Sequence, residues 1–282
     1  MDVTDVPGTA SRVRTRLGEL AVRAYGLDHD GPAVVLWPSM FVDGRTFDRL
    51  LPHLAGRRVV VLDGPGLGES DALVRPSSIA EAAGAALDLL TGPDAAALGI
   101  EGPVDWVGNA FGGHVGYELG VRPGLLRSLT VVGAPPEDLP PALRAQVRVL
   151  LPVLRAFGPV GPVRAAVLAN LLSRDSAADP ALRQVVLDSL ARPTRASLAL
   201  AVRSFVAERR DVTDLLPRLV VPALFVAGDQ RGDWNPADAR RAAALAPGAR
   251  AVAVAGASTL VPLEEPEALA SELHRFWAGL AA

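Results

Sequence analysis

The stretch VDWVGNAFGG, residues 104–113, decides the fold of this chain. An apolar run enters a turn flanked by Gly108 and Gly112, and a helical pattern follows to about Val121. This is the arrangement G-x-S-x-G, which places a serine nucleophile on a sharp turn between a strand and a helix. Ala110 occupies the serine position. Because a methyl group cannot attack a carbonyl carbon, the residues that predict the fold also exclude its usual nucleophile.

Strand and helix patterns alternate on both sides of this turn. Residues 11–25 predict a hairpin, and further strands are expected at residues 33–37, 58–62, 103–107, 126–132, 222–227 and 249–254. Helices are expected at residues 45–54, 78–90, 111–121, 237–245 and 266–280. Such alternation is typical of an α/β fold, here a mostly parallel eight-stranded sheet with helices on both faces.

The alternation of strand and helix patterns is interrupted once. Residues 135–219 carry helical spacing throughout, with prolines as punctuation and no strand pattern. We therefore expect a core formed by residues 1–134 and 220–282, with residues 135–219 inserted as a helical lid. Apolar residues of this lid are predicted to belong first to its core and in part to a substrate pocket: Leu143, Val147, Leu150, Leu151, Leu154, Val167, Leu168, Leu171, Leu198 and Phe205.

Composition limits the function classes. The chain has 282 residues, 50% of them hydrophobic, a net charge of -3 and no cysteine. The absence of a basic cluster argues against nucleic-acid and membrane partners, and the lack of cysteine excludes disulfides and thiolate metal sites. No signal peptide or membrane-spanning run is visible, so a cytoplasmic monomer or homodimer is expected. We expect no cofactor and no metal.

Four segments together carry a family resemblance. They are WPSM at residues 37–40, DGPGLGES at 63–70, GNAFGG at 108–113 and GASTLVPLEEPE at 256–267. In this order and at these spacings the chain resembles the α/β-hydrolase superfamily over nearly its whole length. The resemblance implies an oxyanion loop after residues 33–37, a nucleophile elbow at Ala110 and a histidine loop near the C-terminus.

The resemblance fails at the residues that carry catalysis in that superfamily. Ala110 stands at the nucleophile position, and Thr259 stands at the histidine position. Arg231 falls where the catalytic acid is usual, with Asp233 as a candidate replacement one register away. Threonine is no base near neutral pH, so nucleophile and general base are both missing. An engineered serine-to-alanine change would account for Ala110 alone, whereas two departures in one catalytic unit favour a natural loss.

Backbone donors do not depend on the missing side chains. The resemblance implies an oxyanion hole formed by the N–H of Phe111 and that of Ser39 or Met40. The N-terminus of the following helix favours negative charge at the same point. Because one such donor is worth about 2.7–4 kcal/mol in a hydrolase, the remaining hole can polarise a carbonyl without covalent attack.

Several side chains are candidates for this site, each with an alternative structural role. The polar candidates for catalysis are Asp233, Thr259, Asn109 and Ser39. Asp233 is either a general base or a surface carboxylate. Thr259 either forms a hydrogen bond to a substrate carbonyl or only fills the space of the histidine. Asn109 is either a site residue or part of the turn. The candidate aromatic walls are Trp37 and Trp234, although core packing is the commoner fate of tryptophan.

Three other polar residues are assigned structural roles. His114 is predicted to pack beneath the sheet, pointing away from the tip of the turn. Asp43 is predicted to cap a helix near Gly44, and Asp63 to hold its glycine-rich turn together.

The sequence thus predicts a cofactor-free enzyme with non-hydrolytic chemistry on a hydrophobic small molecule that contains a carbonyl. Cyclisation, isomerisation, elimination or a pericyclic step would suit such a site, with natural-product biosynthesis as the setting that family analogy suggests. Two alternatives remain open. One is a hydrolase of esters or lactones, either inactivated at Ala110 or using water activated by Asp233. The other is a non-catalytic homologue that binds a small molecule.

Overall fold

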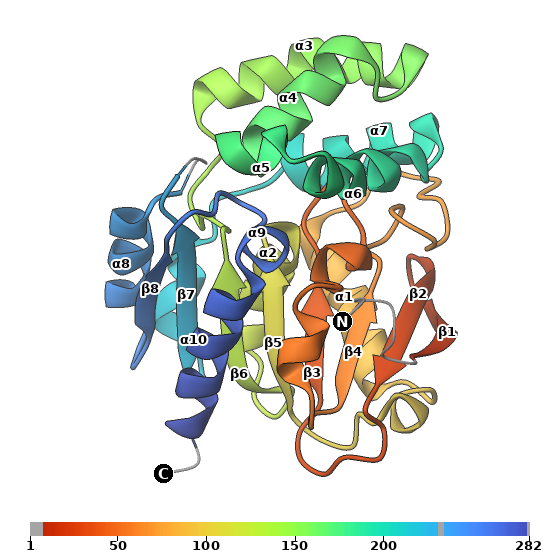
Figure 1. Cartoon of the computed structure of the whole chain (residues 1–282). Helices are drawn as coiled ribbons and strands as arrows, with labels where there is room; N and C mark the ends of the chain where they lie inside the picture. Colours follow the sequence, from red (N-terminus) through yellow and green to blue (C-terminus); the bar gives the residue numbers. More distant parts are fainter. Residues whose placement is uncertain (1–7, 231–233, 281–282) are drawn as a thin grey trace.

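The computed structural model describes residues 8–230 and 234–280, and its centre is a single eight-stranded sheet (Figure 1). The strands are β1 (Thr9–Thr15), β2 (Gly18–Tyr25), β3 (Val34–Trp37), β4 (Val59–Leu62), β5 (Val104–Asn109), β6 (Leu126–Val132), β7 (Ala223–Gly228) and β8 (Arg250–Val254). They are ordered β1-β2-β4-β3-β5-β6-β7-β8. The pairs β1–β2 and β2–β4 are antiparallel, and every other neighbouring pair is parallel. The predicted mostly parallel sheet is confirmed.

Helices cover both faces of this sheet. On one face lie α1 (Ile79–Thr91), α2 (Phe111–Gly120) and α8 (Pro236–Leu245), whose apolar residues join one core cluster. On the other face lie α9 (Val261–Glu264) and α10 (Pro266–Ala278), which share a second cluster with β3 and β4. A short helix η3 (Ala96–Leu98) precedes β5.

The helix expected over residues 45–54 is wrong in type. Two short 3₁₀ helices occupy this segment, η1 (Gly44–Phe47) and η2 (Leu51–Leu54). Pro52 has no N–H to continue an α-helical ladder, so the chain closes tighter i to i+3 turns instead. The turn bond from Leu50 N–H to the Phe47 carbonyl, 2.8 Å, is one of them.

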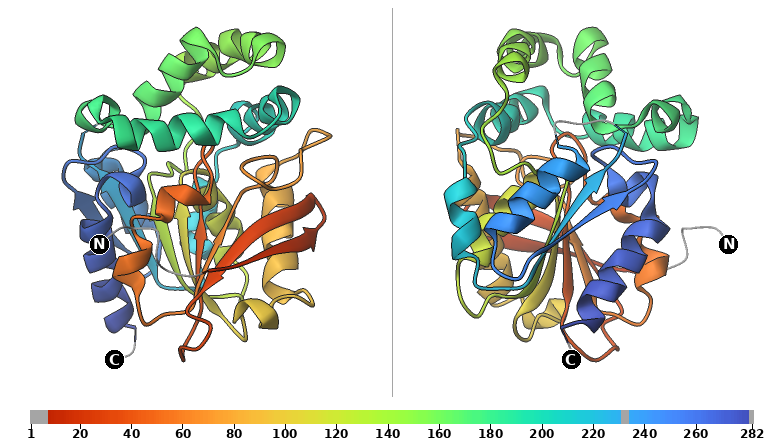
Figure 2. Two further views of the ribbon diagram at one scale, coloured as in Figure 1. Left: turned by 45° about the vertical axis from the view of Figure 1, so that its right-hand side comes forward. Right: turned by 90° about the vertical axis from the view of Figure 1, so that its left-hand side faces the viewer.

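A layer of helices lies over the edge of the sheet at which β5 ends (Figures 1 and 2). We call α3 to α7 the covering helices: α3 (Pro141–Phe157), α4 (Gly161–Leu171), α5 (Arg174–Ala178), α6 (Pro180–Ala191) and α7 (Arg195–Val202). A π-helical turn η4 (Arg203–Ala207) and a 3₁₀ helix η5 (Thr213–Arg218) lead back to β7. Helices α5, α6 and α7 begin where side chains cap them, since Ser173, Asp179 and Thr194 each accept a first-turn N–H.

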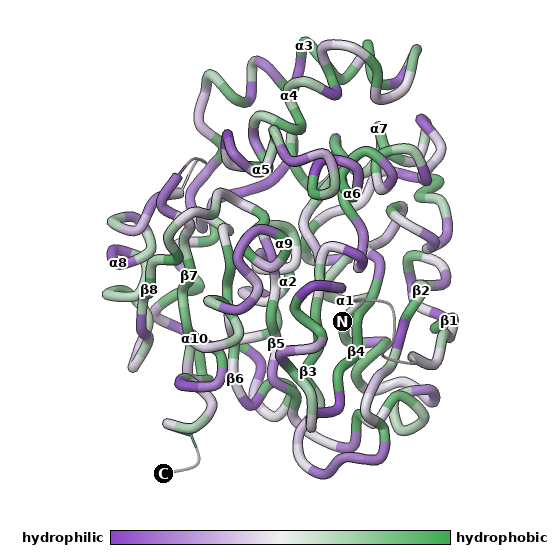
Figure 3. The backbone as a smooth tube through the Cα atoms, viewed as in Figure 1, coloured by the Kyte–Doolittle hydropathy of each residue, from purple (hydrophilic) through white to green (hydrophobic). Residues whose placement is uncertain are grey.

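Hydropathy follows this layering (Figure 3). Strands β3, β4 and β5 are buried along their whole length, as expected for parallel strands covered on both faces. The covering helices alternate apolar and polar residues and turn apolar side chains such as Leu154 and Val167 into the main core cluster. Within residues 8–230 and 234–280, no helix combines the length and the apolarity needed to cross a bilayer.

Candidate functional site

The turn at Ala110 keeps a strained backbone. Ala110 has φ 45° and ψ -98°, a positive φ that side-chain-bearing residues rarely adopt. Its N–H donates to the Val132 carbonyl at 2.7 Å, which fixes the turn against β6. The flanking glycines are required by space, because a Cβ at Gly108 would lie 2.1 Å from the Gly112 carbonyl oxygen and one at Gly112 2.2 Å from that of Trp37. The geometry of a nucleophile elbow is present without the nucleophile.

A cavity of about 180 Å³ lies between this turn and the covering helices. Ala110, Phe111, Ser39 and Met40 line its sheet side. Most of the lid residues predicted to shape a pocket line the opposite side: Leu143, Val147, Leu150, Leu151, Leu154, Val167, Leu171 and Phe205. Leu168 and Leu198 are not among the lining residues. The cavity is therefore mainly apolar, as expected for a hydrophobic ligand.

Aromatic rings form part of the cavity wall. The rings of Phe111 and Phe205 stack with centroids 4.6 Å apart, which joins α2 to η4. Trp234 lines the cavity, as predicted, and is 4% exposed. The expectation for Trp37 was wrong, because its ring is fully buried behind the turn, packed on Trp106 and Phe111 at 5.5 and 5.9 Å, and does not line the cavity.

The backbone donors proposed for an oxyanion hole lie at the cavity. Phe111 is the first residue of α2, so its N–H has no acceptor within the helix. Ser39 and Met40 line the cavity beside it, and the next residue, Phe41, has φ 70°. A strained loop and a helix N-terminus thus meet at one end of the cavity, an arrangement suited to an oxygen that carries negative charge.

Thr259, which the sequence predicts to stand at the histidine position, holds two parts of the molecule together. Its hydroxyl lies at the cavity and donates to the Asn170 carbonyl of α4 at 3.0 Å. Its own carbonyl accepts from the Asn109 side-chain amide at 2.7 Å, and the same amide donates to the Val132 carbonyl at 3.0 Å. Asn109 is fully buried and does not line the cavity, so the structure gives it a bridging role rather than the predicted contact with substrate.

Glu264 makes a second bridge near the same loop. Its buried carboxylate accepts from Ser173 N–H, at the start of α5, at 2.7 Å and from Ser258 N–H at 2.9 Å. The loop that carries Thr259 is therefore fixed to the covering helices through both backbone and side-chain contacts.

His114 is placed differently from the sequence prediction. It is 4% exposed and lines the cavity one helical turn after Ala110, with its Nε2 2.8 Å from the Arg209 guanidinium. Burial, aided by the Arg209 charge, lowers the pKa of His114 well below its ordinary value. The i to i+4 spacing from Ala110 was a signal for this position, since such residues share one helix face. No comparable spacing in the sequence points to Arg209.

Asp233, the candidate replacement for the catalytic acid, lies outside the described residues. Among the lining residues that the structure describes, His114 and Arg209 are the titratable ones. In the described ranges, no group of three or more histidine, aspartate or glutamate side chains is arranged to hold a metal ion.

Comparison with known families fits this architecture. Residues 34–272 match the model of the alpha/beta hydrolase family. The chain belongs to the α/β-hydrolase family. The matched residues include strands β3 to β8, the turn between β5 and α2 and the covering helices.

Several named proteins resemble this α/β-hydrolase family member in sequence. It is 27% identical over 261 residues to the pimeloyl-[acyl-carrier protein] methyl ester esterase of Xanthomonas axonopodis pv. citri, covering 89% of this chain and 96% of the esterase. It is 32% identical over 253 residues to the polyketide synthase ThaQ of Burkholderia thailandensis, covering 84% of this chain. The match spans only 11% of ThaQ, about a tenth of that protein.

Solved structures show the same fold at low sequence identity. A thermophilic esterase from Thermogutta terrifontis superposes with a TM-score of 0.84 at 22% identity, covering 97% of this chain and 100% of the esterase. The enol-lactonase from Burkholderia xenovorans LB400 has a TM-score of 0.83 at 22% identity, covering 95% of this chain and 100% of the lactonase.

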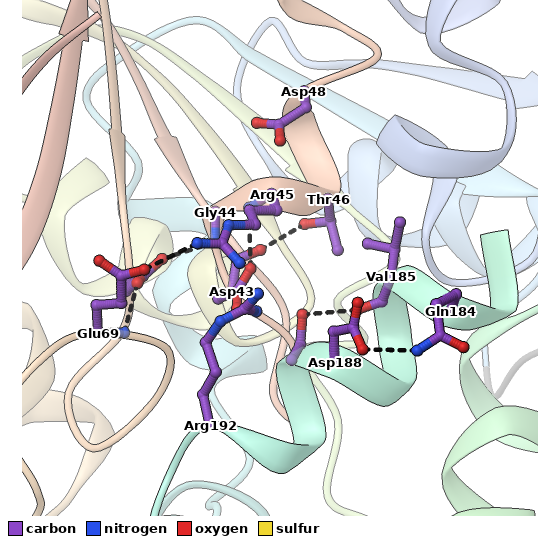
Figure 4. A network of polar contacts seen from close by, with 12 residues as sticks. Asp43, Gly44, Arg45, Thr46, Asp48, Glu69, Gln184, Val185, Asp188 and Arg192 are labelled. Carbon is purple, nitrogen blue, oxygen red and sulfur yellow. Dashed lines mark hydrogen bonds and ion pairs between the residues drawn. The ribbon is translucent and has the colours of Figure 1, made fainter. Parts of the chain in front are cut away.

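A polar network centred on the buried Asp43 joins α6 of this α/β-hydrolase family member to the sheet core (Figure 4). Arg192, at the end of α6, forms an ion pair with the buried Asp43 at 2.5 Å. Asp43 also caps η1 by accepting from Arg45 N–H at 3.0 Å, as predicted. We call Asp43 and Arg192 the junction pair.

Asp63 lies next to the junction pair. Its carboxylate accepts from Gly44 N–H at 2.8 Å and Glu69 N–H at 2.7 Å, which confirms that it holds the glycine-rich turn. Burial, and then the nearby Asp43 charge, raise the pKa of Asp63 to about 6.

Proposed function

We propose that this α/β-hydrolase family member is a cofactor-free enzyme for a non-hydrolytic reaction on a hydrophobic metabolite that contains a carbonyl. Cyclisation, isomerisation, elimination and pericyclic closure are the reaction types that suit it. One observation carries the proposal: an apolar cavity ends at a strained elbow whose backbone is kept while its tip bears only the Ala110 methyl.

The catalytic contribution would come from position and electrostatics. The substrate carbonyl would lie at the Phe111 N–H and the N–H of Ser39 or Met40, where charge that develops on oxygen is stabilised. Residues 135–219 would act as a lid that excludes water and folds the substrate into a reactive conformation. No covalent step is needed, which agrees with the hydroxyl of Thr259 being engaged with Asn170.

The names of the relatives support a substrate class. One acts on a methyl ester of an acyl chain on a carrier protein, and the other is a polyketide synthase. An acyl or polyketide chain offers carbonyl groups for the oxyanion donors and hydrocarbon for the apolar wall. We therefore include β-keto and unsaturated acyl derivatives in the proposed class.

Hydrolysis is the second candidate function, and the esterase and enol-lactonase among the similar proteins favour it. It would require water activated by Asp233, since Ala110 offers no nucleophile. In that case Asp233→Asn abolishes hydrolysis while leaving ligand binding intact.

Product mass separates the two candidates. The protein is incubated with β-keto and enone acyl thioesters, and products are analysed by liquid chromatography and mass spectrometry. Cyclisation or isomerisation leaves the substrate mass unchanged, and elimination removes a small molecule such as water. Hydrolysis instead releases the free acid and thiol. Free acid that forms faster with the protein than in buffer alone would overturn the proposal.

A fluorophosphonate probe supplies the matched test at the elbow. The wild-type protein is expected to remain unlabelled, and Ala110→Ser/Thr259→His is the control that restores a nucleophile and a base. Labelling of the double variant alone shows that the elbow is accessible. Labelling of the wild-type protein reveals another activated nucleophile and contradicts the proposed chemistry.

A further inference from the structure

We propose that His114 binds a second oxygen of the substrate, through its Nδ1–H, one helical turn from the oxyanion donors. The inference rests on the proposed function, because it assigns part of the same cavity. His114 is thereby a specificity-determining residue for hydrophobic molecules with an enolate, phenolate or similarly charge-bearing oxygen.

The tautomer of His114 follows from its partner. Its Nε2 lies 2.8 Å from Nη1 of Arg209. A guanidinium has only donors, so Nε2 must be the acceptor. A histidine that accepts at Nε2 is neutral and carries its proton on Nδ1. Burial and the adjacent positive charge, which lower the pKa of His114, agree with this neutral form.

The Nδ1–H of His114 is a buried hydrogen-bond donor. His114 is only 4% exposed, and among the described residues Nδ1 has no hydrogen-bond partner. A buried polar group without a partner is costly, so such a donor is commonly satisfied by a ligand or ordered water. Because His114 lines the cavity, a ligand that fills the cavity is placed to accept this hydrogen bond.

Arg209 gives this donor a preference for negative charge. Its Nη2 donates to the Glu137 carbonyl at 2.9 Å, which holds the guanidinium while Nη1 donates to the imidazole. Donation from a cation to Nε2 polarises the ring and strengthens Nδ1–H as a donor. Among the described residues that line the cavity, none is a carboxylate that would oppose an anionic oxygen.

The position relative to the elbow sets the substrate pattern. His114 N–H donates to the Ala110 carbonyl at 3.1 Å, so His114 lies one α-helical turn after the elbow. Phe111 and His114 both belong to the first turn of α2 and line the same cavity. A substrate that reaches both points carries two oxygens on a short apolar frame, such as a cyclic or folded dicarbonyl.

Two probe ligands of similar shape isolate the second oxygen. p-Nitrophenolate and nitrobenzene differ by one anionic oxygen, and binding to the full-length protein is measured by calorimetry at a pH where the phenol is ionised. The wild-type protein is expected to bind p-nitrophenolate more tightly than nitrobenzene. His114→Leu is expected to weaken p-nitrophenolate roughly tenfold or more, because a hydrogen bond to a charged group is lost.

Three controls make the outcome specific. Nitrobenzene must bind His114→Leu as it binds the wild-type protein, which shows that the cavity persists. His114→Gln keeps an acceptor for Arg209 and an N–H donor, so it is expected to recover part of the affinity. Tyr117→Phe removes a buried hydroxyl on the same helix that donates to the Ala134 carbonyl, and should leave both affinities unchanged.

Equal weakening of both ligands by His114→Leu, or no weakening of either, would overturn the assignment. An absence of binding by either ligand to the wild-type protein would also count against it. These results concern binding alone. Failure of the proposed non-hydrolytic reaction is read separately, from product mass and fluorophosphonate labelling.

Discussion

The elbow at Ala110 is defined by its backbone geometry, whereas the junction between the covering helices and the core is held by contacts between polar side chains. At the elbow, Ala110 has a positive φ and bears only a methyl group, and Thr259 is predicted to occupy the position of a catalytic histidine. At the junction, polar side chains have partners: Arg192 with Asp43, and the Ser197 hydroxyl with both Gly66 carbonyl and Leu73 N–H.

This contrast shows which properties the molecule maintains. A positive φ at a residue other than glycine costs of order 1–3 kcal/mol and persists only where the surroundings impose it. Ala110 bears this cost without serving as a nucleophile, and the covering helices remain bonded to the core. The cavity and the backbone at its elbow are therefore held in place by contacts within the fold, which is what the proposed reaction would require.

Breaking the elbow backbone is expected to have the largest effect. Gly108→Ala would place a Cβ 2.1 Å from the Gly112 carbonyl oxygen and 2.4 Å from the Gly113 nitrogen, and these backbone atoms cannot rotate away as a side chain could. We expect a loss of about 4 kcal/mol or more in the free energy of unfolding, measured by urea denaturation. Gly102→Ala is the matched control, because its Cβ meets nothing within 4 Å. Similar stability of the two variants would show that the elbow can relax.

Breaking the junction pair is expected to have the second-largest effect on stability. Arg192→Met leaves the Asp43 carboxylate, 2% exposed, without its ion-pair partner. Loss of one member of a buried pair costs about 3–5 kcal/mol, measured by the same denaturation. Arg203→Met is the control on a covering-helix neighbour, since its ion pair with Glu208 is half-exposed and should contribute under about 1 kcal/mol. Equal effects would contradict a special role for the junction.

The junction also predicts a pH dependence. Burial raises the pKa of Asp63 from 3.8 to about 6, so the folded state holds this proton more tightly than the unfolded state. The resulting stabilisation is complete below about pH 4 and is lost as the pH rises to about 6, a change of roughly 3 kcal/mol. Denaturation of the wild-type protein and Asp63→Asn across this range measures it.

Asp63→Asn isolates the titration of this carboxyl, because asparagine does not titrate. The free energy of unfolding of the wild-type protein minus that of the variant should fall by roughly 3 kcal/mol as the pH rises through the window. A constant difference would show that Asp63 has the same pKa in the folded and unfolded states, and a rising difference would show that folding lowers it. Asp43 and Arg23, the charged neighbours, are present in both proteins.

Much of the fold was predictable because its signals are local. The hairpin, the parallel strands and the turn at Ala110 each follow from hydrophobic runs and glycine positions, and the strand Leu126–Val132 was predicted to the residue. The segment at Pro52 was missed because helical spacing does not distinguish one α-helix from two 3₁₀ turns.

The site was less predictable because its contacts join distant segments. Trp37 was misplaced, since sequence position at an oxyanion loop does not reveal which way an indole packs. His114 was expected beneath the sheet, although its spacing from Ala110 indicated the cavity face. Its pairing with Arg209 crosses 95 positions of sequence, and no local pattern reports such a contact.

Thr259 belongs to both regions, and its substitution gives the smallest and most informative effect. If it only fills the space of a histidine, Thr259→Val should leave stability unchanged. If Thr259 instead helps to hold the covering helices on the core, loss of its bond to the Asn170 carbonyl should lower the free energy of unfolding by about 1 kcal/mol. We expect the second result by thermal and urea denaturation.

The conservative variant decides between these readings. Thr259→Ser keeps the hydroxyl and should retain the Asn170 bond, so it is expected to lie closer to the wild-type protein than Thr259→Val does. If valine and serine are equally destabilising, the lost property is methyl packing rather than hydrogen bonding. If valine alone is destabilising, the Thr259 hydroxyl fastens α4 over the cavity, and the loop that carries it is part of what encloses the cavity.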